Sequence, residues 1–362
     1  MTSNLRCLVV DDSALSRKLV RTALESIPGV EVVGIARDGV DAIERCKEYQ
    51  ADFVTMDLEM PRMNGIDAVR ALKEQHPHTK VIMVSSLTSA GANITYQALH
   101  AGAFDFVTKP LATNLDDGIR TLSMQLADKI ASLRESTKVH VPATKIAPTA
   151  THVNEPRVST KSLRSVSVRA LCLGISTGGP VALNTVIPSL PASLSFPIFL
   201  VQHMPPVFTK SLADQLDRNS KVTVVEAADG MMARDGWVYI APGGKQMKVD
   251  FNMGGLQIKI TDDAPESNAK PSVDYLFRHL APIVRDRLVA AVLTGMGADG
   301  TVGCREIKKH GGQIITQDAA SCVVYGMPRS VAEAGLTDAV FPLSEIGTAI
   351  AKLSQESLQP CR

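Results

Sequence analysis

The sequence lacks an excess of charge of either sign. Its 38 Lys and Arg residues are balanced by 37 Asp and Glu residues, so the formal net charge is +1. A protein that binds nucleic acid non-specifically needs a basic field, and this balance argues against that class. Only 4% of the residues are aromatic, which is few for a surface that stacks bases. We therefore expect no nucleic-acid partner.

Long hydrophobic runs and paired cysteines are also missing. No run approaches the ~20 apolar residues of a membrane-spanning helix, and the apolar run 7–10 meets two aspartates too early for a signal peptide. The six cysteines form no C-x-x-C pair, so they indicate neither a zinc site nor a disulfide framework. We expect a cytoplasmic protein with no membrane insertion.

The length of 362 residues predicts two domains, at roughly 150 residues per domain. Over residues 1–135, short β-branched runs at 8–10, 30–35, 53–56, 81–84 and 104–107 alternate with amphipathic stretches. This alternation is typical of an α/β fold with a doubly wound, mainly parallel sheet. Ligands of such sheets bind at the carboxyl ends of the strands.

A change of amino-acid composition separates the two halves of the sequence. Residues 136–167 are rich in Ser, Thr, Pro and basic side chains, which predicts a flexible linker. Strand-like runs then recur over residues 168–358, so we expect a second mainly parallel, Rossmann-like α/β domain. Within it, the alternating segment 237–261 with its paired glycines predicts a β-hairpin excursion from the sheet.

Polar residues follow several strands of the first half. Asp11 and Asp12 end the first predicted strand, Asp57 the third, Ser85 the fourth, and Lys109 follows the fifth. In a doubly wound sheet these ends can neighbour one another, so three carboxylates, a hydroxyl and an ammonium would converge. Such carboxylates need a cation, and hard oxygen ligands suit Mg²⁺. Neutralised in this way, Asp57 is a competent nucleophile toward a phosphoryl group.

Each aspartate on its own could instead be a helix N-cap, but that explanation does not cover the ordered set. The stretches Val-Val-Asp-Asp-Ser, Met-Asp-Leu-Glu-Met-Pro-Arg-Met-Asn-Gly, Met-Val-Ser-Ser and Phe-Val-Thr-Lys-Pro resemble the receiver domain of bacterial response regulators. The resemblance spans the whole first region, 1–135, and implies a flavodoxin-like fold.

The resemblance to receivers also implies roles for individual residues. Asp57 would be the phospho-acceptor, and Asp11, Asp12, Asp57 and the carbonyl of Glu59 would bind Mg²⁺. Ser85 and Lys109 would bind the phosphoryl oxygens, and Phe106 would be the aromatic residue that switches rotamer. It further implies a cis Lys109–Pro110 bond, which costs little before proline.

In the second half, the run 170–173 leads into Gly-Ile-Ser-Thr-Gly-Gly-Pro and then a helix. As G-x-S-x-G, this turn can be a nucleophile elbow that exposes Ser176. As a near match to G-x-G-x-x-G, it can be a dinucleotide-binding loop. The dinucleotide interpretation requires an acidic residue after the next strand, whereas the sequence there is Gln-His-Met. His203 in that position suits a general base.

A third strand-like run, 288–293, ends in a glycine-rich turn that carries Asp299. Ser176, His203 and Asp299 therefore follow three strands of one predicted sheet and could form a hydrolytic triad. Their order differs from the Ser, Asp, His order of α/β-hydrolases, so that fold is not expected. Taken singly, the serine could be a helix N-cap, the histidine a core imidazole and the aspartate a turn former.

Five stretches of this second half, including Gly-Ile-Ser-Thr-Gly-Gly-Pro, Val-Gln-His-Met-Pro and Leu-Thr-Gly-Met-Gly-Ala-Asp-Gly, resemble the catalytic domain of the CheB family of chemotaxis methylesterases. The resemblance covers residues 168–358. It implies hydrolysis of glutamate γ-methyl esters on chemoreceptors and deamidation of receptor glutamines, without a cofactor. The main chain of Met296 would stabilise the oxyanion.

The two resemblances together imply regulation. A chemotaxis histidine kinase would be the phosphodonor, and the receiver would inhibit the esterase until Asp57 is phosphorylated. The alternative is a phospho-switch whose second half only binds a partner. That alternative leaves Ser176, His203 and Asp299 unexplained, and methanol release from methyl-labelled receptor membranes separates the two.

Overall fold

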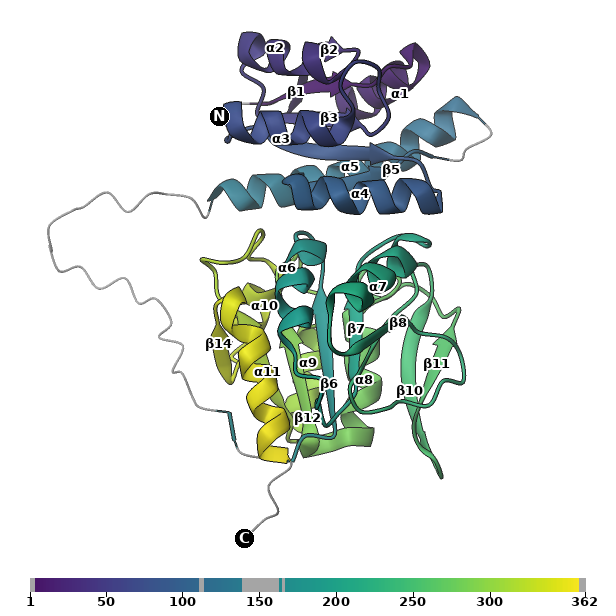
Figure 1. Ribbon diagram of the computed structural model, residues 1–362, viewed down its shortest axis with the longest axis vertical. Helices are drawn as coiled ribbons and strands as arrows, with labels where there is room; N and C mark the ends of the chain where they lie inside the picture. Colours follow the sequence, from purple (N-terminus) through teal and green to yellow (C-terminus); the bar gives the residue numbers. More distant parts are fainter. Residues whose placement is uncertain (1–3, 111–113, 139–162, 165–166, 358–362) are drawn as a thin grey trace, which may run out of the picture. The chain divides into compact units, whose positions relative to one another are not determined.

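The computed structural model describes residues 4–110, 114–138, 163–164 and 167–357 (Figure 1). The chain divides into two compact units, residues 1–133 and 134–362. Each unit has its own buried core. The two are described separately below.

The first unit alternates strands with helices in a regular order. Its elements are β1 (Leu5–Val10), α1 (Ala14–Glu25), β2 (Val30–Ala36), α2 (Gly39–Tyr49), β3 (Phe53–Asp57), α3 (Gly65–Gln75), β4 (Lys80–Ser85), α4 (Ser89–Ala101), β5 (Asp105–Thr108) and α5 (Leu115–Lys138). α5 thus continues three residues past the predicted end of the domain at residue 135.

The five strands of this unit form one parallel sheet in the order β2-β1-β3-β4-β5. The central strand β3 is buried along its whole length, as expected for a strand covered on both faces. Helices α2, α3 and α4 contact one another in sequence. On the other side of the fold, the hydroxyls of Ser26, after α1, and Ser123, in α5, are 2.8 Å apart.

The second unit is larger and carries Ser176, His203 and Asp299. Its strands and helices are β6 (Ala170–Ile175), α6 (Gly179–Val186), β7 (Ile198–Gln202), α7 (Phe208–Asn219), β8 (Thr223–Glu226), β9 (Trp237–Ile240), β10 (Gln246–Asn252), β11 (Gly255–Thr261), α8 (Val273–Val284), β12 (Leu288–Val292), α9 (Thr301–Lys309), β13 (Gln313–Gln317), α10 (Met327–Glu333), β14 (Ala339–Phe341) and α11 (Leu343–Ser357). Two short 3-10 turns, Ile187–Ser189 and Arg285–Arg287, complete it.

Seven of these strands form a parallel sheet in the order β14-β13-β12-β6-β7-β9-β8. Successive residues of β6 point to opposite faces, and all six are buried. α8, α9 and α10 contact the central strands, and α6 contacts α7 and α11; Figure 1 shows α6, α7 and α11 together on the side of the sheet nearer the viewer. This two-faced covering leaves the strand ends as the place for chemistry.

The predicted fold class is confirmed: both units are α/β with mainly parallel sheets. The predicted hairpin corresponds to the antiparallel pair β10 and β11, which forms a separate sheet, whereas β9 at the start of that segment joins the parallel sheet. The three-residue β14 was not predicted. Most of the predicted linker, 139–162 and 165–166, lies outside the described residues.

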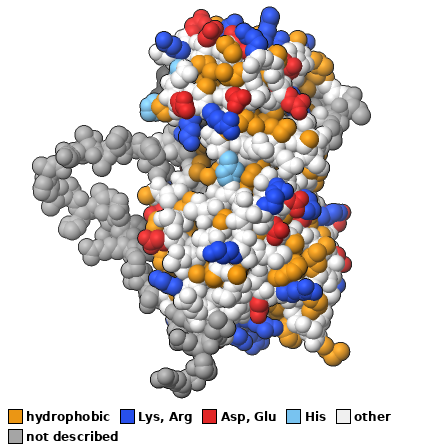
Figure 2. Space-filling view, viewed as in Figure 1, with side chains coloured by type: hydrophobic (Ala, Val, Ile, Leu, Met, Phe, Trp, Pro, Cys, Tyr) orange, Lys and Arg blue, Asp and Glu red, His pale blue; other side chains and the backbone are white. Residues whose placement is uncertain are grey.

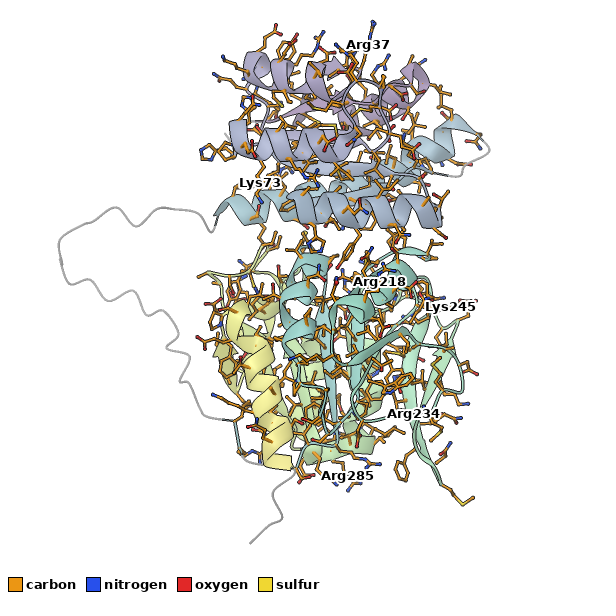
Figure 3. The ribbon with its side chains drawn as sticks, viewed as in Figure 1. Arg37, Lys73, Arg218, Arg234, Lys245 and Arg285 are labelled. Atoms are coloured by element: carbon orange, nitrogen blue, oxygen red, sulfur yellow. The ribbon has the colours of Figure 1, made fainter. Side chains whose placement is uncertain are left out.

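Charged side chains of both signs occur on the visible face of the described residues (Figure 2). Figure 2 shows acidic and basic groups interspersed on the face in view. The basic residues labelled on the second unit in Figure 3 lie on different elements: Arg218 on α7, Arg234 before β9, Lys245 before β10 and Arg285 after α8. Among the described helices, none is both long and apolar enough to cross a membrane.

Candidate functional site

The carboxyl ends of β1 and β3, which are neighbours in the sheet, place three aspartates together. Ligand atoms of Asp11, Asp12 and Asp57 all lie within 4.8 Å of one another. Lys109, just after β5, reaches the same point: its Nζ lies 3.0 Å from Asp11 Oδ2 and 2.9 Å from Asp57 Oδ2. The predicted convergence of these four side chains is therefore present.

The electrostatics of this acidic site follow from burial of like charges. Burial raises the pKa of Asp57, and the nearby Asp11 carboxylate raises it further, outweighing the Lys109 ammonium. Burial lowers the pKa of Lys109, but the two carboxylates outweigh that effect and hold it above its usual value. One ammonium thus only partly compensates the carboxylates, and an additional cation would stabilise them.

The other residues expected at this site lie around it. Ser85 is buried, and its Oγ contacts both the adjacent Ser86 carbonyl and α4, where Thr95 Oγ1 donates to it at 2.7 Å. Phe106 is buried in β5, next to β4. Glu59 is exposed in the loop after β3. Their roles in binding a phosphoryl group remain predictions.

The peptide bond before Pro110 differs from expectation. In the described residues the cis peptide bond is Lys270–Pro271, and Lys109–Pro110 is not cis. The prediction of a cis bond after Lys109 was therefore wrong. The trans form is the lower-energy one for an X-Pro bond.

In the second unit, three strand ends bring a serine, a histidine and an aspartate into line. His203 Nδ1 lies 3.2 Å from Ser176 Oγ, and His203 Nε2 lies 2.8 Å from Asp299 Oδ2. Ser176 follows β6, His203 follows β7 and Asp299 lies in the loop after β12, and β6 is between β12 and β7. The structure thus brings the three predicted residues together, with the imidazole between hydroxyl and carboxylate.

The turn that holds Ser176 depends on two glycines, Gly178 in the same turn and Gly295 in the loop after β12. Gly178 has φ +80°, a left-handed conformation that favours glycine. A Cβ on Gly295 would lie 2.8 Å from Ser176 Cβ, so the loop after β12 can approach the serine only without a side chain there. Ser176 N–H also donates to Thr294 O at 3.0 Å, which fastens the two loops together.

Asp299, in the loop after β12, is buried, and its carboxylate faces the N-terminus of α8. Ser272 Oγ donates to its Oδ1 at 3.0 Å, and the main-chain N–H groups of Val273 and Asp274 donate to its two oxygens at 2.8 Å each. Burial alone would raise the pKa of Asp299, but the hydrogen bond from His203 and these N–H groups outweigh it and lower the pKa. Asp299 is therefore held as a carboxylate facing His203.

Two supporting residues were not identified from the sequence. Gln202 Nε2 donates to Ser176 O at 3.0 Å and to His203 O at 3.2 Å, linking the two loops. Ser272 is the N-cap of α8. A Ser before an apolar periodic segment is a known helix-start signal, so Ser272 could have been found, but its bond to Asp299 could not.

The oxyanion candidate Met296 lies two residues after Thr294 in the same loop and is half-buried. The loop is anchored at the preceding residue: Gly295 N–H donates to Val324 O at 3.0 Å, and Met327 N–H donates to Gly295 O at 2.8 Å. This anchoring holds the main chain near Ser176, while the oxyanion role of Met296 remains a prediction.

Fold and geometry thus define a class: a two-domain α/β protein with a carboxylate and lysine site in one domain and a serine, histidine and aspartate group in the other. Family models match both parts. Residues 7–117 match the response regulator receiver domain, and residues 171–350 match CheB methylesterase.

Relatives match nearly the full length of the chain. A protein-glutamate methylesterase/protein-glutamine glutaminase of Desulfotalea psychrophila is 43% identical over 355 residues, covering 96% of this chain and 98% of the relative. One of Bacillus subtilis with the same name is 41% identical over 351 residues, covering 96% and 97%. The crystal structure of the Thermotoga maritima CheB methylesterase catalytic domain aligns with a TM-score of 0.51 and 42% identity, covering 52% of this chain and 100% of that domain.

The chain belongs to the CheB family of response-regulator methylesterases, and it is a protein-glutamate methylesterase/protein-glutamine glutaminase. This membership favours a catalytic second domain over the alternative of one that only binds a partner.

Proposed function

We propose that this chain hydrolyses glutamate γ-methyl esters on chemoreceptors, and deamidates specific receptor glutamines, with Ser176, His203 and Asp299 as its catalytic triad. The observation that carries the proposal is the unbroken line from Ser176 Oγ through the His203 imidazole to Asp299, at 3.2 and 2.8 Å. Chemoreceptors as substrates follow from the family to which the chain belongs.

In the first half of the reaction, Ser176 Oγ attacks the carbonyl carbon of the ester while its proton passes to His203 Nδ1. The C–O bond to the methoxy group breaks, the leaving oxygen takes the proton from His203, and methanol departs. Proton transfer of this kind contributes roughly 10²- to 10⁴-fold. Asp299 fixes the ring and stabilises its charged form.

In the second half, water attacks the acyl-enzyme with His203 as base, and the free glutamate side chain and Ser176 hydroxyl are restored. The same steps release ammonia when the substrate is a glutamine amide. The main-chain N–H of Met296 donates to the oxyanion in both halves, and one such donor is worth about 3 kcal/mol.

For the receiver we propose that Asp57 is the phospho-acceptor. The donor set fits Mg²⁺, because three clustered carboxylates are hard oxygen ligands and one ammonium compensates them only partly. Asp11, Asp12, Asp57 and the carbonyl of Glu59 would hold the ion, which when bound neutralises charge as an anionic donor approaches. Lys109 and Ser85 bind the phosphoryl oxygens, and Phe106 changes rotamer in response.

We further propose that a chemotaxis histidine kinase supplies the phosphoryl group, and that the unphosphorylated receiver inhibits the esterase. Phosphorylation replaces the single carboxylate charge of Asp57 with a phosphoryl group that carries nearly two negative charges, a net gain of about one. It activates the esterase by relieving this inhibition.

The test of the triad is methanol release from receptor membranes carrying labelled methyl esters. Ser176→Ala and His203→Ala each abolish release while leaving phosphorylation of Asp57 intact, because the two sites lie in separate domains. Ser220→Ala is the matched control, since Ser220 Oγ is buried without a hydrogen-bond partner and lies outside the triad. Near-normal methanol release from folded Ser176→Ala protein would show that another group is the nucleophile.

A further inference from the structure

Asp274, in the first turn of α8, holds the start of α9 with its side chain. Its Oδ1 accepts hydrogen bonds from Gly300 N–H at 2.9 Å and Gly303 N–H at 2.7 Å. Its Oδ2 accepts one from Ser267 Oγ at 3.1 Å. Asp274 is only 2% exposed, so these bonds are shielded from water. The carboxylate therefore acts as a buried cap on α9.

Hydrogen bonds in both directions connect Asp274, in the first turn of α8, with the residues at the start of α9. Asp274 donates its main-chain N–H to Asp299 Oδ1 at 2.8 Å, and its carboxylate binds the N–H of Gly300, the residue after Asp299. The carboxylate of Asp299 thus faces the start of α8, and that of Asp274 faces the start of α9. A shift of either helix start would move Asp299 relative to His203.

The close approach of the two helices is built into the sequence at Gly303. A Cβ at this position would lie 2.5 Å from Phe277 Cβ and 3.3 Å from Asp274 Cα. Only glycine therefore lets the N–H of residue 303 reach the Asp274 carboxylate at the observed distance.

A carboxylate at residue 274 has an electrostatic cost that a simple helix cap would avoid. Burial raises the pKa of Asp274 most, and the negative charge of Asp299 raises it further. The hydrogen bond from Gly303 N–H opposes both effects, and the resulting pKa is about 6. An asparagine would offer the same Oδ1 acceptor without repelling Asp299. The hydrogen bonds to Gly300 and Gly303 thus require an acceptor at residue 274 and not its charge.

We infer that Asp274 is a positioning residue for ester hydrolysis, because its bonds to Gly300 and Gly303 hold Asp299 where Asp299 orients His203. The inference rests on the proposed triad. Asp274 acts through Asp299 and binds no substrate atom in this scheme. Its loss should therefore lower kcat and leave KM unchanged.

The experiment measures kcat and KM for methanol release by full-length Asp274→Ala, Asp274→Asn and, as control, Asp338→Ala. Asp338 also accepts a main-chain N–H, that of Ile314 at 2.9 Å, and pairs with Lys308, but at the start of β13. Asp274→Ala should lower kcat by about 10²-fold, the scale of a misplaced catalytic group. Asp274→Asn, which keeps the Oδ1 acceptor, should recover to within about tenfold of wild type. Asp338→Ala should keep the wild-type kcat.

A folded Asp274→Ala protein with wild-type kcat would overturn the inference, and so would an equal fall of kcat in Asp338→Ala. If Asp274→Ala does not fold, Asp274→Ser keeps a shorter acceptor, and the same fall of kcat at unchanged KM is expected of it. Ser176→Ala is measured alongside. Activity in Ser176→Ala would refute the proposed triad, whereas an inactive Ser176→Ala with a fully active Asp274→Ala refutes only the positioning role.

Discussion

Lys109 Nζ lies 2.9 Å from Asp57 Oδ2, so the ammonium after β5 directly contacts the carboxylate that ends β3. The same Nζ lies 3.0 Å from Asp11 Oδ2. Lys109 is therefore the counterion of two carboxylates that would also bind Mg²⁺. An ammonium and a divalent cation compete for the same oxygens.

Removing that ammonium should strengthen Mg²⁺ binding. In Lys109→Ala the carboxylates lose their counterion, so the dissociation constant for Mg²⁺ should fall below the wild-type value in a calorimetric titration. Lys129→Ala is the control, because Lys129 pairs with Asp105 at 2.8 Å away from the acidic cluster. Weaker Mg²⁺ binding in Lys109→Ala would show that the two cations do not compete.

Phosphorylation of the receiver should depend on a divalent cation. Incubation with acetyl phosphate and Mg²⁺ should label wild-type protein, and EDTA should abolish labelling, because Asp57 must approach an anionic donor. Asp57→Asn should take up no phosphate under either condition. Labelling that persists in EDTA would refute the metal requirement.

Asp299→Asn should lose most esterase activity but keep more than Ser176→Ala. The substitution retains the nucleophile and removes the charge that orients and stabilises the imidazolium, a change that costs up to about 10⁴-fold in kcat. The measurement is methanol release with circular dichroism as a check of folding. A residual rate no higher than that of Ser176→Ala in a folded protein would contradict the orienting role.

The raised pKa of Asp274 predicts a pH-dependent stability difference. Folded Asp274 binds its proton up to about pH 6, whereas the unfolded side chain ionises near its ordinary 3.8. Protonated Asp274 therefore contributes its full stabilisation of the folded state below pH 3.8, and this stabilisation is lost as the pH rises through about 6. Asn does not titrate, so the unfolding free energy of Asp274→Asn minus that of wild type should increase between these pH values, by up to about 3 kcal/mol.

Urea titrations at closely spaced pH values measure that difference. Asp338→Asn serves as the control for the same substitution elsewhere in the domain, because Asp338 also accepts a main-chain N–H, that of Ile314, and is paired with Lys308. A difference that stays flat or falls with rising pH would mean that burial does not favour protonated Asp274.

Removal of the receiver should raise esterase activity. A fragment of residues 165–362 retains the core of the second unit and should be more active than the unphosphorylated whole chain. An interdomain bias of 1–2 kcal/mol corresponds to about 5- to 30-fold. Asp57→Asn should hold the whole protein at the low rate. A folded fragment that hydrolyses receptor esters no faster than the unphosphorylated whole chain would exclude inhibition by the receiver.

The sequence alone determined the order of the strands along the chain and the residues at the strand ends. Short β-branched runs followed by amphipathic stretches are local patterns, and parallel sheets put all carboxyl ends on one edge. Asp57 and Lys109 in one domain, and Ser176 and His203 in the other, could therefore be placed together before any coordinates. The three-residue β14 escaped because a run that short has no readable period.

Only the tertiary structure decided how the Asp299 carboxylate is held. Asp274 and Asp299 lie on different elements, and their exchange of hydrogen bonds requires the starts of α8 and α9 to meet, with Gly303 allowing the contact. No local periodicity encodes which helix N-terminus faces which carboxylate. That depends on how the two helices pack against each other, because side-chain packing and burial set their approach.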